Sequence, residues 1–225
     1  ARRLRDHARQ LSTGEETELS VVIGDTNPLP ETLGLLRSFF DSRPGTRLHL
    51  HFESISGPLE RLLDGEADLI LHHIDKSDPR LEFIDLFRAK VVPVVAPHFL
   101  KFPISKSITP ERMRDYVQCV IRDSARHSPP RDFYLVEGAR TWTVGDQLMK
   151  RELILQGMGW GHMPHFLIEQ DLRDKRLLSI AGKHFPGAEV ELVAARRRDA
   201  PHGPVANRLW QYIAEEAAKM VPKGG

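Results

Sequence analysis

The sequence predicts an α/β fold built from two strand–helix halves. In the first half, residues 19–92, short apolar strands alternate with amphipathic helices as far as residue 71, and only short turns separate them. This alternation favours parallel strands joined by right-handed crossovers. A second strand–helix series occupies residues 93–198, and a final amphipathic helix is predicted from about Pro204 to Met220. The chain has 225 residues, which fits one large domain or two small ones.

The first half is predicted to begin with a strand at residues 19–24. Asn27 and Pro28 follow it, and this pair is typical of an N-cap and the first position of a helix. Apolar residues then recur at helical spacing. They predict a buried helix face made of Leu33, Leu36, Phe39 and Phe40.

Residues 47–53 alternate apolar and polar side chains, and the polar side carries His49, His51 and Glu53. A strand with one polar face is expected at an edge or an interface of a sheet. A helix through residues 59–63 and an apolar strand at residues 67–71 follow.

Two further strands around the end of the first half at residue 92 lead into a second half that is predicted to mix strands, short helices and a hairpin. Strands are expected at residues 83–87, 91–96, 117–121, 176–180 and 189–195, helices starting at Thr109, Asp146 and His165, and a hairpin at residues 133–136 and 140–144.

Three glycines, Gly157, Gly159 and Gly161, follow the helix that starts at Asp146, and Pro164 precedes the next helix. Glycine just past a helix end supplies left-handed backbone, and proline suits the first turn of a new helix. We therefore expect a structural corner between two helices, with Trp160 packed inside it.

Composition and charge exclude several classes of protein. The formal net charge of +1 provides no basic field of the kind that nucleic-acid-binding domains carry. No apolar run is long enough to span a membrane, and no signal peptide precedes the fold, so we expect a cytoplasmic protein without membrane contacts. The single cysteine, Cys119, cannot form a disulfide within the chain.

The sequence predicts neither an enzyme nor a cofactor. It contains no Gly-x-Ser-x-Gly elbow, P-loop or dinucleotide fingerprint, and Cys119 lies in an apolar strand, which is a poor setting for a nucleophile. The paired histidines at 49/51, 72/73 and 162/165 lack a metal-binding helix motif or a cysteine partner, so no metal is expected. A surface site at His49, His51 and Glu53 stays open as an alternative.

Four motifs resemble one family in their order and spacing. Asp64–Ile70 resembles the D-G-E-x-D-L of the effector-binding domain of LysR-type transcriptional regulators, and Phe39–Pro44 resembles that family's F-x-x-x-x-P. Gln156–Pro164 resembles its x-G-x-G-W-G-x-x-P. Leu172–Leu178 is similar to its L-x-x-G-R-L-V, although Lys175 stands where glycine is usual.

The resemblance implies a periplasmic-binding-protein type 2 architecture, with two Rossmann-like subdomains, two crossover strands and a ligand cleft between the subdomains. Residues 1–17 would be the end of a linker helix and a connector, residues 18–92 plus 199–221 subdomain I, and residues 93–198 subdomain II. DNA would be bound only through an N-terminal winged helix-turn-helix that is absent from this chain. The alternative, a free solute-binding protein of the same fold, is disfavoured by the basic helical stretch at residues 1–13.

Ligands of open parallel sheets sit beyond the carboxyl ends of the strands, where helix N-termini favour anions. Each hydroxyl there can also be a simple helix cap, but together they suit a small anionic effector. Arg126 or His127 could close on its carboxylate. The residues predicted to bind effector are Thr26, Asn27, Ser54, Ser56, His73, Pro97, Ser124 and Thr143.

The resemblance also implies an antiparallel homodimer, and a tetramer stays open as an alternative. The helix face Leu33–Phe40 and the strand Arg47–Phe52 would contact the partner's second subdomain, near the helix at residues 146–156. Such an interface would be isologous, with the same patches used on both copies.

Overall fold

The computed structural model describes residues 14–220, so the linker helix predicted at residues 1–13 lies outside the described residues. The chain forms two compact units. Unit 1 contains the chain up to Glu53, Pro58–Phe87 and the chain from Glu191 onward, and unit 2 contains Ser54–Gly57 and Arg88–Val190. The subdomain boundaries expected at residues 92 and 198 stay predictions.

Unit 1 has a mainly parallel arrangement of strands in its N-terminal part. Its elements are β1 (Glu18–Gly24), α2 (Leu29–Phe40), β2 (Arg47–Glu53), α3 (Gly57–Leu63), β3 (Leu69–His72) and α7 (Pro204–Met220), with parts of β4 (Leu81–Val95) and β9 (Ala188–Arg197). Strand β1 pairs in parallel with both β2 and β3, as the alternation of strands and helices predicts. Strand β3 then pairs antiparallel with β9.

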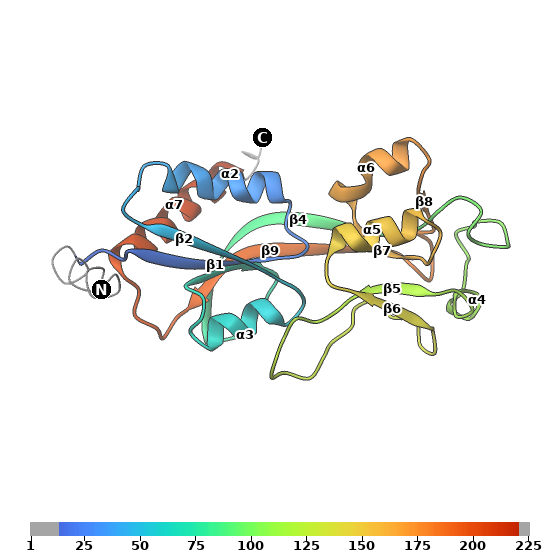
Figure 1. Ribbon diagram of the computed structural model, residues 1–225, viewed down its shortest axis with the longest axis horizontal. Helices are drawn as coiled ribbons and strands as arrows, with labels where there is room; N and C mark the ends of the chain where they lie inside the picture. Colours follow the sequence, from blue (N-terminus) through green and yellow to red (C-terminus); the bar gives the residue numbers. More distant parts are fainter. Residues whose placement is uncertain (1–13, 221–225) are drawn as a thin grey trace. The chain divides into compact units, whose positions relative to one another are not determined.

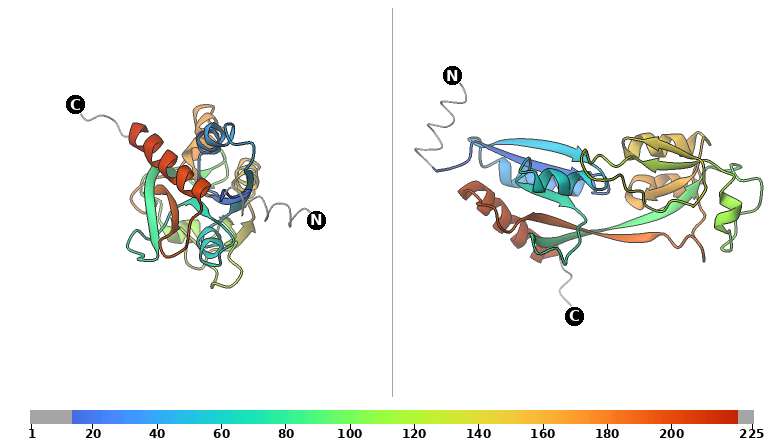
Figure 2. Two further views of the ribbon diagram at one scale, coloured as in Figure 1. Left: turned by 90° about the vertical axis from the view of Figure 1, so that its left-hand side faces the viewer. Right: turned by 90° about the horizontal axis from the view of Figure 1, so that it is seen from below.

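The strand order of the larger sheet is β2-β1-β3-β9-β4-β7, with β8 paired to β4. Strand β2 ends this order among the described residues, which confirms the predicted edge strand. The long strands β4 and β9 are hydrogen-bonded neighbours and run side by side (Figure 2). The predicted pair of strands at 83–87 and 91–96 is wrong, because β4 continues through Arg88–Lys90 without a break. The polar residues there lie on exposed stretches of one strand.

Alternate residues of the unit 1 strands face two different layers. Leu19, Val21 and Ile23 pack with α2 and α7 in one core cluster, whereas Val22 packs with α3 in another. The two faces of the sheet are therefore covered by different helices, as Figure 1 shows. This two-residue alternation is the expected consequence of strand geometry when both faces are buried.

Helix α2 differs from its prediction in its start and its phase. Asn27 is not the N-cap: Pro28 holds that position, and the Asn27 amide instead donates to the Gly24 carbonyl at 3.0 Å and to the Leu71 carbonyl at 2.6 Å. The buried stripe consists of Thr32, Leu35, Leu36 and Phe39, and the predicted core residue Leu33 is 40% exposed. That stripe has the three- and four-residue spacing of one helix face, so Leu33 falls beside it.

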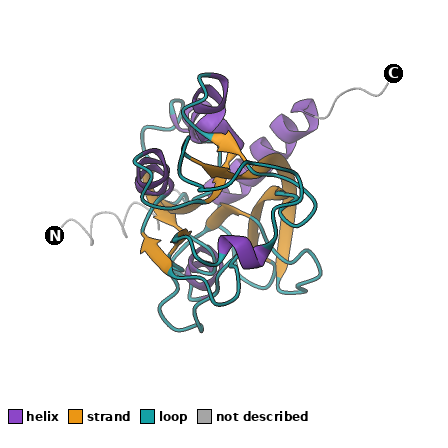
Figure 3. Ribbon diagram, turned by 90° about the vertical axis from the view of Figure 1, so that its right-hand side faces the viewer, coloured by secondary structure: helices purple, strands orange, loops and turns teal. Residues whose placement is uncertain are grey.

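Unit 2 contains many loops between short elements (Figure 3). Besides the remaining parts of β4 and β9, its elements are α4 (Pro110–Met113), β5 (Gln118–Ile121), β6 (Thr141–Val144), α5 (Gln147–Leu155), β7 (Gly161–Pro164), α6 (His165–Arg173) and β8 (Leu178–Ser179). The predicted helix start at Asp146 is confirmed, because its carboxylate accepts from the Met149 N–H at 2.7 Å.

The predicted hairpin at residues 133–136 and 140–144 is wrong. Strand β6 pairs in parallel with β5, and residues 133–136 form no strand. Their backbone is held by the buried side chain of Gln118, which donates to the Tyr134 carbonyl at 2.8 Å and accepts from the Val136 N–H at 2.9 Å. One glutamine side chain thus satisfies backbone groups that a partner strand was expected to pair.

The predicted corner at residues 157–164 is partly correct. Gly157 has a left-handed backbone, with φ of 69°, and the Trp160 side chain is fully buried. However, Gly161–Pro164 is not a simple turn but strand β7, which pairs antiparallel with β4. The backbone of Trp160 is also hydrogen-bonded to β5 and the residue before it, through Cys119 and Val117, at 2.7 and 3.0 Å. The glycines therefore allow a close crossing of two chain segments.

Candidate effector-binding site

Three of the predicted effector-binding residues, Ser54, Ser56 and Ser124, come together in unit 2. The Ser54 N–H donates to the Ser124 hydroxyl at 2.9 Å, and that hydroxyl donates to the Ser54 carbonyl at 3.1 Å. The Ser54 hydroxyl donates to the Arg122 carbonyl at 2.7 Å. Ser54 is buried, with 3% of its surface exposed, so these bonds replace bonds to water.

Between Ser54 and Ser56, the backbone takes an unusual conformation. Ile55 has φ of 57°, in the left-handed region that a β-branched side chain rarely adopts. The Gly57 N–H donates to the Ser54 carbonyl at 3.0 Å, which closes a tight turn. Residues in such conformations cost about 1–3 kcal/mol and persist only where the surroundings hold them, often at functional sites.

Asp123 is the residue of this site that the sequence prediction missed. Its side chain is 9% exposed, and its carboxylate accepts three backbone N–H groups, from Ser56 and Ala125 at 3.0 Å and from Arg131 at 3.1 Å. It lies two residues beyond the carboxyl end of β5, beside Ser124 in the chain. Its place after a strand end could have identified it from the sequence, because the rule that selects hydroxyl residues at strand ends applies equally to an acidic residue there.

Thr26, Asn27 and His73 belong to unit 1. They follow the carboxyl ends of β1 and β3, which are neighbouring parallel strands. The Thr26 hydroxyl and the Asn27 side-chain carbonyl are buried atoms that have no hydrogen-bond partner within residues 14–220. His73 stacks on His72, with ring centroids 3.9 Å apart. Buried polar atoms of this kind are costly unless a water or ligand satisfies them.

Pro97 and Thr143 lie in unit 2 but outside the hydrogen-bonded group at Ser54. Pro97 is exposed just after β4, and Thr143 is exposed on β6, where it pairs with Val120 of β5. The predicted closing residues Arg126 and His127 lie in the loop that Asp123 organises. The eight predicted residues therefore fall into three groups. Thr26, Asn27 and His73 lie in unit 1, Ser54, Ser56 and Ser124 are hydrogen-bonded together in unit 2, and Pro97 and Thr143 lie elsewhere in unit 2.

Within residues 14–220, no group of three or more histidine, cysteine, aspartate or glutamate side chains could hold a metal ion. Burial raises the pKa of the Cys119 thiol, so it is protonated and weakly nucleophilic at neutral pH. In the same part of the chain, no helix is both long and apolar enough to cross a bilayer.

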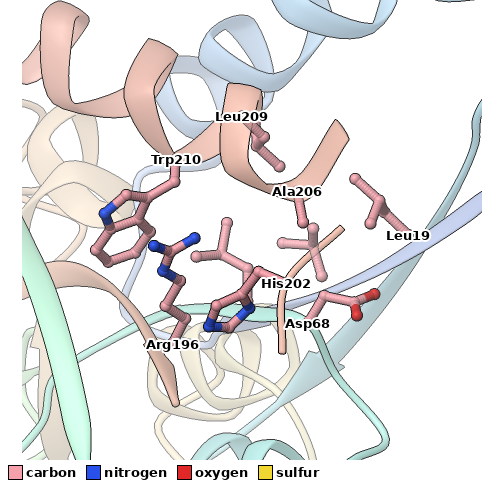
Figure 4. Close-up of a pocket in the computed structure, with 9 residues that line it drawn as sticks. Leu19, Asp68, Arg196, His202, Ala206, Leu209 and Trp210 are labelled. Carbon is pink, nitrogen blue, oxygen red and sulfur yellow. The ribbon is translucent and has the colours of Figure 1, made fainter. Parts of the chain in front are cut away.

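A pocket in unit 1 is too small to hold an effector (Figure 4). Its volume is about 10 Å³, which is room for one water molecule. Arg196 and Trp210 lie at one side of it, with the guanidinium carbon 4.5 Å from the ring centroid. Burial raises the pKa of the Asp68 carboxyl, which accepts from the Ser20 N–H at 2.8 Å. This pocket is a small gap in the packing between helix α7 and the strands of unit 1.

The model of the family described as LysR substrate binding domain matches residues 12–218. A probable HTH-type transcriptional regulator, YhaJ of Escherichia coli strain K12, is 26% identical over 203 residues, which are 89% of this chain and 67% of that protein. The chain thus spans about two thirds of the length of this relative.

Solved structures with the same fold include the regulatory domain of CrgA, a LysR-type regulator from Neisseria meningitidis. It has a TM-score of 0.61 and 17% identity, over 89% of this chain and 98% of that one. The effector-binding domain of QuiR in complex with shikimate has a TM-score of 0.62 and 14% identity, and the match covers 90% of this chain and 98% of that one. These likenesses confirm the predicted periplasmic-binding-protein type 2 fold. The family model matches most of this chain. The chain therefore belongs to the LysR substrate binding domain family, the effector-binding regulatory part of LysR-type transcriptional regulators.

Proposed function

We propose that this domain senses a small anionic effector through Thr26, Asn27, Ser54, Ser56, His73, Pro97, Ser124 and Thr143. The observation that carries the proposal is the meeting of Ser54, Ser56 and Ser124, because it brings together residues about 70 positions apart around backbone donors that already hold one carboxylate. The solved QuiR domain, in complex with shikimate, supports an acidic ligand for the fold.

The first test is a thermal-shift screen of small carboxylates and aromatic acids. A ligand at 100-fold over its Kd should stabilise the wild type by about 2.7 kcal/mol, which for a chain of this size raises Tm by about 5–10 °C. For the ligand found, Thr26→Val and Ser124→Ala are each expected to raise Kd by about tenfold, because each removes a hydroxyl of the proposed site. Kd is measured by calorimetry.

Ser107→Ala is the matched control, since Ser107 is an exposed serine of unit 2 that bonds to Ser105. It should leave Kd unchanged. Wild-type affinity in both Thr26→Val and Ser124→Ala would show that the effector binds elsewhere.

We further propose that the domain acts in the cytoplasm as part of a longer DNA-binding protein. The relative YhaJ is a probable HTH-type transcriptional regulator and extends beyond the region matched here. Effector would favour one conformation through its differential affinity, and the coupling to DNA would run through the dimer. The wild-type domain alone is therefore expected to show no specific operator binding.

A homodimer is proposed from the apolar surface of α2 and β2. Leu50 and Phe52 are paired in register with Val21 and Ile23, which face the α2 core cluster, so they lie on the α2 side of the sheet. They are nevertheless 45% and 48% exposed, and α2 itself exposes Leu29 and Leu33. Unit 2 exposes Leu148 and Met149 on α5, the helix predicted to meet this face in the partner. Exposed apolar side chains on α2 and β2 are what a contact with a second copy would cover.

Phe52→Glu is expected to convert the dimer into a monomer, because it would place an unpaired charge in the interface. Sedimentation velocity at micromolar concentration measures the change. His51→Glu is the control, since the neighbouring residue of the same strand points to the opposite face. A dimer that survives Phe52→Glu would exclude the β2 face from the interface.

A further inference from the structure

We infer that Asp123 acts as an internal carboxylate that occupies the anion-binding donors of the site, so an anionic effector must displace it to bind. This inference rests on the proposed function, because it assumes that the effector uses the donors at Ser54 and Ser56. In this structure, the anion-binding donors of the site would then be occupied by a side chain of the protein itself.

The contacts of Asp123 are those of a bound anion. One oxygen, Oδ1, accepts from the Ser56 and Ala125 N–H groups, both at 3.0 Å, and Oδ2 accepts from the Arg131 N–H at 3.1 Å. The three donors come from separate stretches of chain and together hold one carboxylate, and hydrogen bonds of this kind to a charged acceptor are stronger than those between neutral groups. Any ligand carboxylate would meet the same donors, and it would meet the negative charge of Asp123 beside them.

The neighbouring groups are occupied in the same way. The Ser54 N–H and hydroxyl, which would serve an effector, are bonded to the Ser124 hydroxyl and the Arg122 carbonyl. Residues 122–124 thus supply an acceptor for each of three donors in residues 54–56. These three hydrogen-bond donors are therefore already bonded to acceptors within the protein.

The segment that Asp123 holds is strained. Ile55 keeps its left-handed φ of 57° between Ser54 and Ser56, whose backbone N–H groups are both bonded to residues 123–124. Releasing Asp123 would allow Ile55 to return to a favoured backbone conformation. That relaxation offsets part of the loss of the Asp123 bonds, which makes displacement by a ligand feasible.

The test uses acetate, because it is the smallest carboxylate and copies the end of an aspartate side chain. Titrations are followed through the backbone amide resonances of residues 54–57 and 122–131 in the wild type, Asp123→Asn and Asp123→Ala. Acetate is expected to bind about tenfold more tightly to both variants than to the wild type, since the competing charged acceptor is gone. Acetamide, at matched ionic strength, should show no such gain.

Asp146→Asn is the matched control. Asp146 also accepts a backbone N–H, from Met149 at 2.7 Å, but that donor belongs to helix α5 and not to residues 54–57 or 122–131. Its exchange should leave acetate binding at wild-type strength. A second measurement needs no variant: in the wild type, saturating acetate should move the Asp123 carboxyl carbon resonance together with the Ser56 and Arg131 amides.

The outcomes separate the inference from the proposed function. Shifts at residues 54–57 with equal Kd in wild type and variants, or an unmoved Asp123 carboxyl resonance, would overturn the inference alone. Weaker binding in Asp123→Asn would also overturn it, because Asp123 would then help to hold the ligand. If acetate shifts only amides outside both segments in every protein, or binds none of them, the proposed site fails as well.

Discussion

Replacing Gly159 by alanine is expected to destabilise the domain by about 3 kcal/mol, near the upper end of the cost of overpacking a core. A Cβ at this position would lie 2.6 Å from the Cys119 sulfur and 2.9 Å from the Val117 carbonyl oxygen. Because the oxygen belongs to the backbone, relief requires the chain crossing itself to open. Thermal unfolding monitored by circular dichroism should show a decrease in Tm of about 6–12 °C.

Gly45→Ala is the control for this substitution. Gly45 lies in a turn, and nothing approaches within 4 Å of the place its Cβ would take. This exchange should change stability by no more than about 0.5 kcal/mol, as is usual for surface sites. A Gly159→Ala protein as stable as Gly45→Ala would mean that the crossing of β7 and β5 is looser than described.

The second large effect concerns acid stability. Burial, and then the positive charge of Lys150, lower the pKa of His162 from 6.5 to about 3. The unfolded chain therefore binds a proton at this residue between pH 6.5 and pH 3, whereas the folded chain does not, so stability falls as pH falls through this window. Between pH 7 and pH 4.5 the loss from this one residue is about 2–3 kcal/mol.

His162→Phe is expected to remove this part of the acid sensitivity. The imidazole stacks on Tyr134 with ring centroids 4.5 Å apart, and its Nδ1 has no hydrogen-bond partner within the described part of the chain, so a phenyl ring preserves the main contact. Urea unfolding at pH 7 and pH 4.5 measures the difference in free energy of unfolding. The same exchange at exposed His184 is the control. Equal pH slopes in His162→Phe and wild type would mean that His162 is protonated in the folded state.

The sequence predicts the first half of the fold well, because β1, β2 and β3 show clean patterns that depend on local geometry. It fails where long-range contacts decide the outcome. The polar residues at 88–90 look like a turn, but they are tolerated inside β4 because that part of the strand is partly exposed. Residues 133–136 look like a strand, but the side chain of Gln118 takes the place of a partner.

The candidate site, too, can be predicted where local patterns decide it and not where long-range contacts do. The rule that ligands lie beyond strand ends selects Ser54, Ser56 and Ser124, and the structure brings these three together. The rule does not reveal that Asp123 satisfies the N–H of Ser56, since the two residues are 67 positions apart in sequence. Neither does it predict the exposed positions of Pro97 and Thr143. Local patterns indicate which residues are available, and only the folded chain decides which donors they meet.

The discontinuity of unit 1 determines when it can fold during synthesis. Its main core joins Leu19 and Leu36 to Ala194, Leu209 and Ile213, so it stays incomplete until residues 194–213 have left the ribosome. Residues 88–190, by contrast, form most of unit 2 as one continuous stretch. Domains normally fold in order from the N-terminus. Here the strands made first keep part of their apolar surface uncovered until helix α7 has been made.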